Sequence, residues 1–274
     1  MGTGFRHRRP RSRVRFLHDG VVTARVRSWP GRPDVAHVVS TDHQRSPTVG
    51  AVRSWCDLLR LEGYSMVRTG ALSADAAQSF ERAGFRSIQS LALLRLDDQE
   101  RLRRLRRLAR PAVAMRSMHS TRSLLTAASI DRRAFGVEWD LDVTAIREAC
   151  RATPSHRIRL AVTAADEPAG YMITGRSGSS GFVQRLAVNP VHQGQGIGNA
   201  LMQDGLRWLG RARVDDILDR SRVDDILVNT HLDNVAALQL YESWGFHRLD
   251  ENLQVMELDL ESSDRPPSSS GDRT

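Results

Sequence analysis

The chain has 274 residues, a length that predicts two domains, each large enough to bury its own hydrophobic core. Hydrophobic residues make up 40% of it and charged residues 26%, and no apolar run approaches the roughly 20 residues of a membrane span, which argues against a membrane protein. The net charge of +8 comes from arginine, because the sequence contains no lysine. Aromatic residues, at 5%, are too sparse for the surface that binds single-stranded nucleic acid, so we expect no nucleic-acid partner.

Both ends of the chain have compositions typical of disorder. Residues 1–13 are rich in arginine and residues 262–274 in serine and proline, so we expect neither end to carry chemistry. The basic N-terminus lacks the apolar stretch of a secretory signal, which predicts a cytoplasmic protein. Cys56 and Cys150 have no metal-ligand spacing, so we expect two reduced, structural thiols and no metal site.

In chain order, the first expected elements are a helix at 73–85 and a strand at 90–97. The segment 97–119 then spaces three leucines three residues apart among arginines, which predicts a short amphipathic helix that Pro111 ends. We interpret it as a linker helix packed by its leucines. The alternative is a basic surface helix for a membrane or RNA. The expected domains are therefore 14–96 and 120–261 on either side of this linker.

The second half predicts helices that lead into a sheet. Residues 123–152 have helical periodicity, with turn-like breaks near Gly136 and Pro154. In the segments that follow, apolar residues recur with the period of strands or of helices. We expect strands at 157–165, 169–176, 182–188, 226–231 and 253–260 and helices at 199–212 and 234–244. The fold class is thus α/β.

A tandem repeat interrupts this pattern. The six residues RVDDIL occur at Arg213 and again at Arg222, a period of nine, and two copies are too few for a solenoid. Removing one copy would leave a connection of ordinary length between helix and strand. We therefore predict a tandem duplication that bulges out between these elements.

A glycine-rich loop that opens a helix is the strongest chemical signal. Glycines allow backbone N–H groups to point inward, and the helix N-terminus adds partial positive charge, so such a loop can hold a pyrophosphate. A Walker loop is excluded because it needs a lysine, and a Rossmann site is disfavoured by the late position in the chain. The loop consists of Gln193, Gly194, Gln195, Gly196, Ile197 and Gly198.

Two motifs resemble the GNAT N-acetyltransferase family. Leu186–Pro190 followed by Gln193–Gly198 is similar to its acetyl-CoA motif, and Asn234–Phe246 is similar to its N-x-x-A-x-x-L-Y-x-x-x-G-F segment. The resemblance covers roughly residues 120–260. It implies a mixed, mostly antiparallel sheet with splayed central strands, flanked by helices, and acetyl-CoA as co-substrate.

The resemblance also implies roles for individual residues. Tyr241 would be the general acid that protonates the departing thiolate, because a phenol with a pKa near 10 donates a proton without being ionised at neutral pH. The backbone of β-strand residues would bind the pantetheine, the glycine loop and the start of its helix would bind the pyrophosphate, and an asparagine would contact the cofactor near its thioester. The residues implied in cofactor binding, beyond the loop and Tyr241, are Leu186, Ala187, Val188, Asn199 and Asn234.

The general base is less clearly marked. Asn229 stands where the ribosomal-protein-type N-terminal acetyltransferases have a glutamate, and an amide cannot take a proton. His231 lies on the same strand face with a suitable ordinary pKa near 6.5, so we take it as the candidate base. Glu138 and Asp140 are weaker candidates for binding a cationic amine.

The first half resembles a second, degenerate copy of the same unit. Residues 73–85 track Asn234–Phe246, but Phe80 replaces the tyrosine, and only Gly50 survives of the three loop glycines. The expected activity is transfer of an acetyl group from acetyl-CoA to a primary amine of a small molecule or peptide by the second copy. The alternative is a catalytically inactive acyl-CoA-binding module. The oligomeric state is left open.

Overall fold

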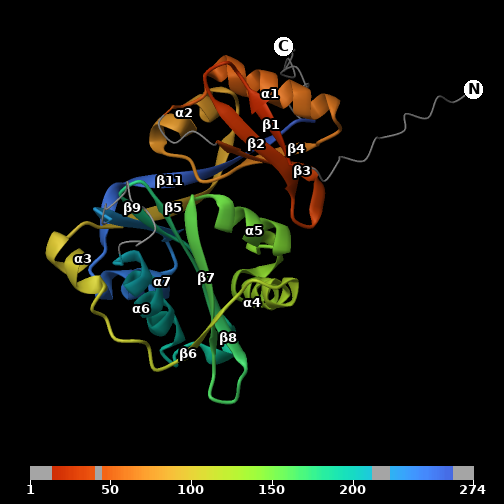
Figure 1. Ribbon diagram of the computed structural model, residues 1–274. Coiled ribbons are helices and arrows are strands. Elements are labelled where there is room, and N and C mark those ends of the chain that lie inside the picture. The colour runs from red at the N-terminus through yellow and green to blue at the C-terminus, as the bar shows by residue number, and fades with distance from the viewer. Residues whose placement is uncertain (1–13, 41–44, 212–222, 262–274) are drawn as a thin grey trace, which may run out of the picture. The chain divides into compact units, whose positions relative to one another are not determined.

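The computed structural model describes residues 14–40, 45–211 and 223–261. The predicted disorder of both ends and the duplicated segment from Arg213 to Ser221 lie outside these ranges. The chain forms two compact units, which we call the first unit (1–91 and 251–274) and the second unit (92–250). The C-terminal segment thus belongs with the N-terminal part of the chain. The units are drawn in Figure 1.

The first unit is a small mixed sheet with two helices. Its strands neighbour one another in the order β1-β2-β3-β4-β11-β5, where β1 to β3 are antiparallel, β4 runs parallel to β3, and β11 runs antiparallel to β4. Its elements are β1 (Arg15–His18), β2 (Thr23–Trp29), β3 (Arg32–Ser40), α1 (Val49–Leu61), β4 (Met66–Thr69) and α2 (Ala74–Arg82), with parts of β5 (Arg86–Leu96) and β11 (His247–Asp259).

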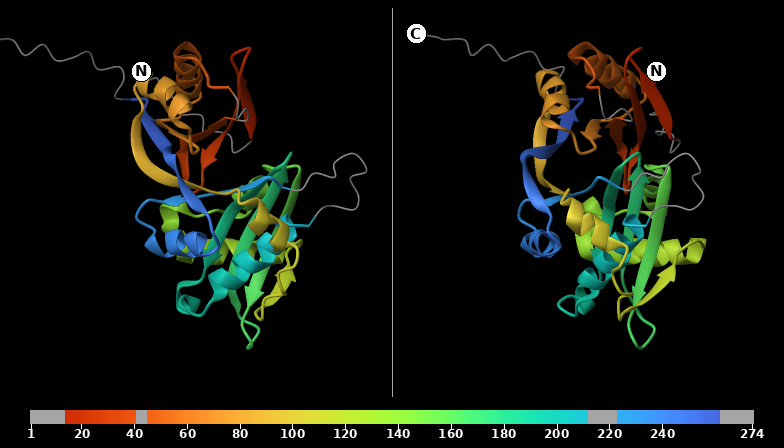
Figure 2. Two further views of the ribbon diagram at one scale, coloured as in Figure 1. Left: turned by 90° about the vertical axis from the view of Figure 1, so that its left-hand side faces the viewer. Right: turned by 60° about the vertical axis from the view of Figure 1, so that its left-hand side comes forward.

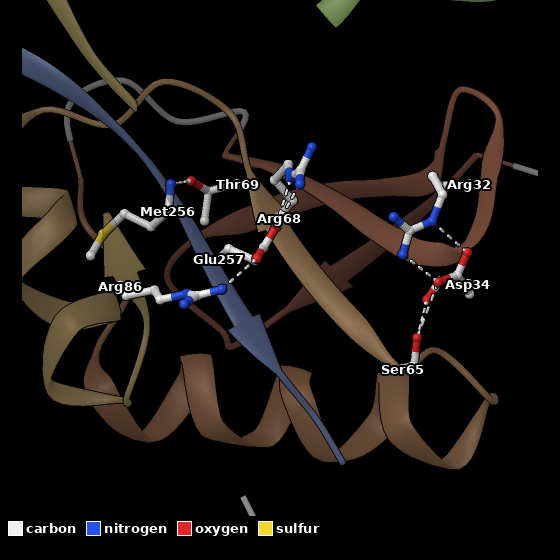
Figure 3. A network of polar contacts seen from close by, with 8 residues as sticks. All are labelled: Arg32, Asp34, Ser65, Arg68, Thr69, Arg86, Met256 and Glu257. Atoms are coloured by element: carbon white, nitrogen blue, oxygen red, sulfur yellow. Dashed lines mark hydrogen bonds and ion pairs between the residues drawn. The ribbon is translucent and has the colours of Figure 1, made fainter. Parts of the chain in front are cut away.

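The C-terminal strand is part of the core of the first unit. Met256 and Leu260, which are 4% and 1% exposed, pack in one cluster with residues of α1 and α2. The buried pair Arg68–Glu257 joins β4 to β11 with Nε–Oε2 and Nη2–Oε2 distances of 3.0 and 2.6 Å, and Thr69 Oγ1 accepts a hydrogen bond from the Met256 amide (Figure 3). Breaking a buried ion pair costs several kcal/mol, so β11 is tied to β4 by charge as well as by packing.

The second unit is larger and contains the glycine loop. Its strands neighbour one another in the order β5-β10-β9-β8-β7-β6, all antiparallel from β6 to β9, with β10 parallel to β9. Its elements are α3 (Gln99–Leu105), β6 (Ala114–Ser117), α4 (Thr121–Trp139), α5 (Val143–Arg151), β7 (Ser155–Val162), β8 (Pro168–Ser177), β9 (Ser180–Val188), the 3₁₀ turn η1 (Pro190–His192), α6 (Ile197–Leu209), β10 (Asp225–His231) and α7 (Val235–Ser243).

Helices cover both faces of this sheet. In Figures 1 and 2, α4 and α5 lie on one side of β7 and β8, and α6 lies on the other. The two buried clusters agree: one joins α4 and α5 to the strands, and the other joins α6, α7 and α3 to them. Because both its faces are covered, β8 is buried over seven consecutive residues. The mixed α/β sheet expected from the sequence is confirmed.

The segment 97–119, expected as a linker, is structured within the second unit. Its leucines do pack as expected: Leu102 and Leu105 of α3 are each 5% exposed and join the cluster around α6. After α3, β6 pairs antiparallel with β7 from Ala114↔Val162 onward. The segment therefore supplies a helix and an edge strand to this unit. No described helix is long and apolar enough to cross a membrane.

Candidate functional site

The site is built around the place where β9 and β10 stop pairing. Their parallel ladder runs from Asp225↔Ser180 to Val228↔Val183 and ends there, although β9 continues to Val188 and β10 to His231. Backbone groups beyond the last pair require other partners. The splayed central strands expected from the sequence are thus present, and Leu186, Ala187 and Val188 lie on the free stretch of β9 while their other edge pairs with β8.

The glycine loop leaves the start of α6 open to a ligand. Gly194 and Gly196 have φ angles of +74° and +75°, a region that side chains disfavour, and a Cβ built on either meets no atom within 4 Å. Gly196 precedes α6, and none of the described side chains caps this helix. Its first N–H groups and its dipole therefore remain available to an anion such as a pyrophosphate.

Neighbouring side chains brace this loop. Gln193 and Gln195 donate hydrogen bonds from Nε2 to the carbonyl oxygens of Val188 and Val191, at 3.5 and 3.2 Å. Ile197 is buried, whereas a Cβ on Gly198 would lie 3.3 Å from Leu240 Cδ2, so this glycine permits the close approach of α6 and α7. The loop therefore combines free backbone donors with a fixed shape.

The two asparagines of the expected site both have structural partners. Asn199 Oδ1 accepts a hydrogen bond from Trp244 Nε1 at 3.0 Å, which joins the start of α6 to the end of α7. Asn234 Oδ1 accepts one from the Ala237 amide at 3.2 Å and so caps α7. Each side-chain oxygen thus accepts a hydrogen bond that helps to hold a helix.

Tyr241 lies on α7, and its ring is buried in the hydrophobic cluster that also includes residues of the free stretch of β9. It is 5% exposed and shares a cluster with Leu186 and Val188, and its ring centroid is 6.0 Å from that of Phe246. Burial raises the pKa of Tyr241 to about 12, and the nearby charge of Arg185 acts in the opposite direction. The phenol therefore keeps its proton at neutral pH, as a proton donor must.

His231 is less well placed to act as a base. It is at the exposed end of β10, where Nδ1 accepts a hydrogen bond from the Asp233 amide at 3.2 Å and lies 3.6 Å from Asp233 Oδ2. A neutral imidazole that accepts at Nδ1 carries its proton on Nε2. Uptake of a second proton by His231 would require this hydrogen bond to break. Asn229, on the same strand, is exposed.

On the α4 side of the sheet, Asp140 follows the last turn of α4. Partial burial raises the pKa of its carboxyl above the ordinary range, and Arg132 opposes the shift. Glu138, two residues earlier, is exposed. Next to them lies a buried group formed by Asp131, Tyr171 and Arg185, which sequence reasoning missed. The feature that could have revealed it is a charged residue, Asp131, on the buried face of the helix that also carries Ala127 and Ile130.

A cavity of about 660 Å³ lies between α4 and η1. It is lined by Arg122, Thr126, Arg133, Asn189 and His192 among others. Neither Tyr241 nor β10 lines it.

The two cysteines also lie apart from any site: burial raises the pKa of Cys56 to about 12 and that of Cys150 to about 11, so neither is a ready nucleophile.

The first unit repeats the local structure but not the open site. Phe85 donates its amide to the Phe80 carbonyl, as Phe246 does to Tyr241, and the aromatic rings of each pair are in contact. In the first unit, however, β4 ends at the last pair, Val38↔Thr69, and β3 continues for only two residues beyond it, to Ser40.

The helix start also differs in the first unit. The Thr48 side chain caps α1 by accepting a hydrogen bond from the Ala51 amide at 3.1 Å. The Thr48 hydroxyl thus binds an N–H group at the start of α1, whereas the corresponding N–H groups of α6 have no such cap. The two halves share a strand-helix-strand-helix-strand order. Among the described residues, the second half differs by the longer unpaired end of β9, the uncapped start of α6 and the tyrosine at the position of Phe80.

Comparison with known proteins agrees with this geometry. Residues 155–248 match the family model of the acetyltransferase (GNAT) domain. The chain therefore carries a GNAT acetyltransferase domain. Enzymes of this class transfer acyl groups from acyl-CoA. No curated protein matches the chain.

Solved structures similar to the chain share its two-part fold. A tandem GNAT protein from the clavulanic acid biosynthesis pathway has a TM-score of 0.61 at 14% identity, over 89% of this chain and 81% of that one. GCN5-related N-acetyltransferases from Kribbella flavida (TM-score 0.56, 11% identity, 89% of each chain) and Sphaerobacter thermophilus (0.52, 16%, 89% and 77%) are also similar. At these identities the likeness concerns the fold, which is that of tandem GNAT proteins.

Proposed function

We propose that this protein is a cytoplasmic N-acetyltransferase that moves the acetyl group of acetyl-CoA to a primary amine of a small molecule or peptide. The observation that carries the proposal is the uncapped glycine start of α6 after the free end of β9, with the protonated Tyr241 buried in the hydrophobic cluster that includes residues of both. An anion site, a strand edge and a proton donor are what binding and cleaving an acyl-CoA thioester require.

In this proposal the residues divide the work as follows. The backbone of Leu186–Val188 binds the pantetheine amides, and Gln193–Gly198 with Asn199 binds the pyrophosphate, while the amide of Asn234 contacts the cofactor near its thioester. The amine nitrogen attacks the acetyl carbon, the carbon–sulfur bond breaks, and Tyr241 donates its proton to the departing sulfur. The proton released by the amine goes to a base or to water, and His231 is the candidate base once its Nδ1 is free of the Asp233 amide.

We further propose that the first unit is a degenerate copy with a structural role. Its strands end within two residues of their last pair, the Thr48 side chain caps the helix start, and the Phe80 ring has no proton to donate. It would accordingly bind acetyl-CoA poorly.

The second candidate function is an acyl-CoA-binding module without catalysis. It is favoured by Asn229, which cannot take a proton, and by the engaged Nδ1 of His231. Both candidates require cofactor binding, and only the first requires turnover.

One experiment separates the two. Free-thiol release from acetyl-CoA is measured with the full chain across aminoglycoside antibiotics, polyamines, cysteinyl-sugar amines and peptides with free N-termini, and acetyl-CoA binding is measured by calorimetry. Amine-dependent thiol release supports the transferase. Binding of one acetyl-CoA per chain with no release over the whole panel would support the binding module, and absence of binding would exclude both.

A further inference from the structure

The cavity between α4 and η1 takes no part in the transfer site. Its volume of about 660 Å³ is within the range of sites for small organic ligands. Arg122 and Arg133 line it from one face of α4, because eleven residues make about three helical turns. Asn189 and the turn η1 form the opposite wall. The cavity thus has its own lining, separate from Tyr241 and β10.

One wall of the cavity contains a buried amide without a partner. Asn189 is 5% exposed, and its Oδ1 has no hydrogen-bond partner among the described residues. Its backbone is already engaged: the amide donates to the Ala169 carbonyl and the carbonyl accepts from the His192 amide, each at 2.8 Å. A buried acceptor without a donor is destabilising, so such a group calls for a partner from outside the chain. Because Asn189 lines the cavity, an O–H or N–H group of a ligand there can supply the donor.

The charges around the cavity favour an anion. Arg122 and Arg133 are exposed, and neither has a carboxylate partner within the described ranges. Glu167 also lines the cavity, and its Oε2 lies 3.8 Å from Nε2 of His192. Two guanidinium groups therefore outnumber the one carboxylate of the described lining. A guanidinium binds a carboxylate through paired, charge-assisted hydrogen bonds, so a carboxylate suits this lining.

The cavity also carries exposed apolar surface. Leu125 of α4 and Val191 of η1 are 57% and 70% exposed, and both line it. Exposed apolar side chains are ordinary when they are scattered, but here two of them share one cavity with convergent polar groups, which is typical of a ligand site. A ligand with an apolar body would remove both from water. The walls therefore ask for a molecule that is partly apolar and not for a bare inorganic ion.

The same wall is continuous with the glycine loop. The Val191 carbonyl accepts a hydrogen bond from Gln195 Nε2 at 3.2 Å, and the Gln193 amide donates to the Pro190 carbonyl at 3.2 Å. The turn that lines the cavity thus helps to hold the loop proposed to bind the pyrophosphate. Cavity and loop lie on one stretch of backbone without sharing their lining.

We propose that this cavity binds a small organic acid that is neither the cofactor nor the amine. Its carboxylate contacts Arg122 or Arg133, its apolar body covers Leu125 and Val191, and a hydroxyl or N–H group donates to Asn189. The inference goes beyond the proposed function. Its test measures binding and needs no turnover, so the two can fail independently.

Three related molecules test the three features of the ligand. Calorimetry with the full chain uses α-hydroxyisocaproate, which has a carboxylate, a branched apolar body and one hydroxyl. We expect saturable binding of one molecule per chain with a Kd of about 1 mM or lower. Isocaproate lacks only the hydroxyl and should bind about fivefold more weakly. The methyl ester of the hydroxy acid lacks the charge and should bind about tenfold more weakly or less. Saturating acetyl-CoA should not displace the hydroxy acid.

Variants assign each contact to a residue. Asn189→Leu keeps the size of the side chain, so it should weaken the hydroxy acid to the level of isocaproate, leave isocaproate unchanged and not lower Tm, because it removes an acceptor that has no donor. Arg122→Met and Arg133→Met together should weaken both acids about tenfold. The matched control is Arg132→Met: Arg132 is an exposed arginine of the same helix that does not line the cavity, and its loss should change neither Kd.

The result that would overturn the proposal differs for each part. Absence of saturable binding would overturn it outright, and displacement of the hydroxy acid by acetyl-CoA would place the cavity within the cofactor site. Equal affinity for the two acids, or inorganic phosphate binding as tightly as the hydroxy acid, would show general attraction of anions and no built site. Should Asn189→Leu not fold, the comparison of the two acids on the unchanged chain and the arginine variants decide the matter.

Discussion

Replacing Tyr241 by phenylalanine removes one oxygen from the site and leaves the packing in place. The ring is 5% exposed and lies against Phe246, and among the described residues its hydroxyl has no recorded hydrogen-bond partner. The free energy of unfolding should therefore change by about 1 kcal/mol or less. A loss of activity in this variant would then report chemistry and not loss of fold.

The size of that loss follows from the environment of the phenol. Its pKa of about 12 keeps Tyr241 protonated throughout the neutral range, but it also makes Tyr241 a weaker acid than an exposed phenol. We therefore expect kcat to fall by about 10²-fold in Tyr241→Phe, the lower end of the range for a positioned general acid. This corresponds to a rise of about 2.7 kcal/mol in the activation free energy. For the unchanged protein, ionisation of Tyr241 should not lower kcat until the pH approaches 12.

The assay is thiol release at saturating amine, with the acetyl-CoA Kd measured by calorimetry. Tyr64→Phe is the matched control: Tyr64 is a tyrosine of the first unit that is 4% exposed, and its loss should leave kcat unchanged. Full turnover by Tyr241→Phe with an unchanged Kd would remove Tyr241 from the mechanism. Loss of cofactor binding in step with kcat would show that the hydroxyl acts in binding.

Further predictions test the loop, the swapped strand, acid stability and the duplication. Gly196→Ala should lower the free energy of unfolding by about 1–2 kcal/mol through backbone strain and raise the acetyl-CoA Kd at least about tenfold. The control is Gly20→Ala, at a glycine with a similarly positive φ and equally open surroundings, which should lower stability by the same amount and leave the Kd unchanged. Met256→Ala should destabilise by about 2–5 kcal/mol and speed amide exchange in β2 and β3; faster exchange in β7 and β8 instead would contradict the assignment of β11 to the first unit. Burial and nearby arginines lower the pKa of His37 to about 3, so the folded state favours the neutral imidazole, and the free energy of unfolding should fall as the pH drops from about 6.5 towards 3. In His37→Phe the free energy of unfolding should fall less steeply with pH over this range. An equal dependence on pH in both proteins would refute His37 as the cause. Deleting Arg213–Ser221 should leave folding and activity nearly intact, and loss of soluble protein would count against a dispensable duplication.

Local features of the site could be predicted from the sequence because their causes are local. The helix after Gly196 and the positive φ at Gly194 and Gly196 follow from residues a few positions apart. The same holds for the helix that contains Tyr241 and ends before Gly245, whose φ is +88°. The glycine loop that opens a helix and the end of the Tyr241 helix at Gly245 were both expected from the sequence.

The membership of the last strand was decided by tertiary structure. Residues 253–260 alternate as a strand in either unit, and the sequence pattern indicates a strand without naming its neighbour. We had expected this segment to complete the domain 120–261. In the structure, Glu257 meets the buried Arg68 and Met256 enters the core of the first unit, contacts between residues 187 or more positions apart in the chain.

The same reason explains the group that sequence reasoning missed. Nothing in the sequence near Asp131 or Arg185 identifies the other as its partner, because the two residues are 54 positions apart. Periodicity and composition carry information over one or two turns of helix or a few residues of strand. They predict where chain segments are helical, extended or open to phosphate. Which charges become buried together depends on how the sheet brings distant segments into contact, because burial allows a charge only where a partner is already in place.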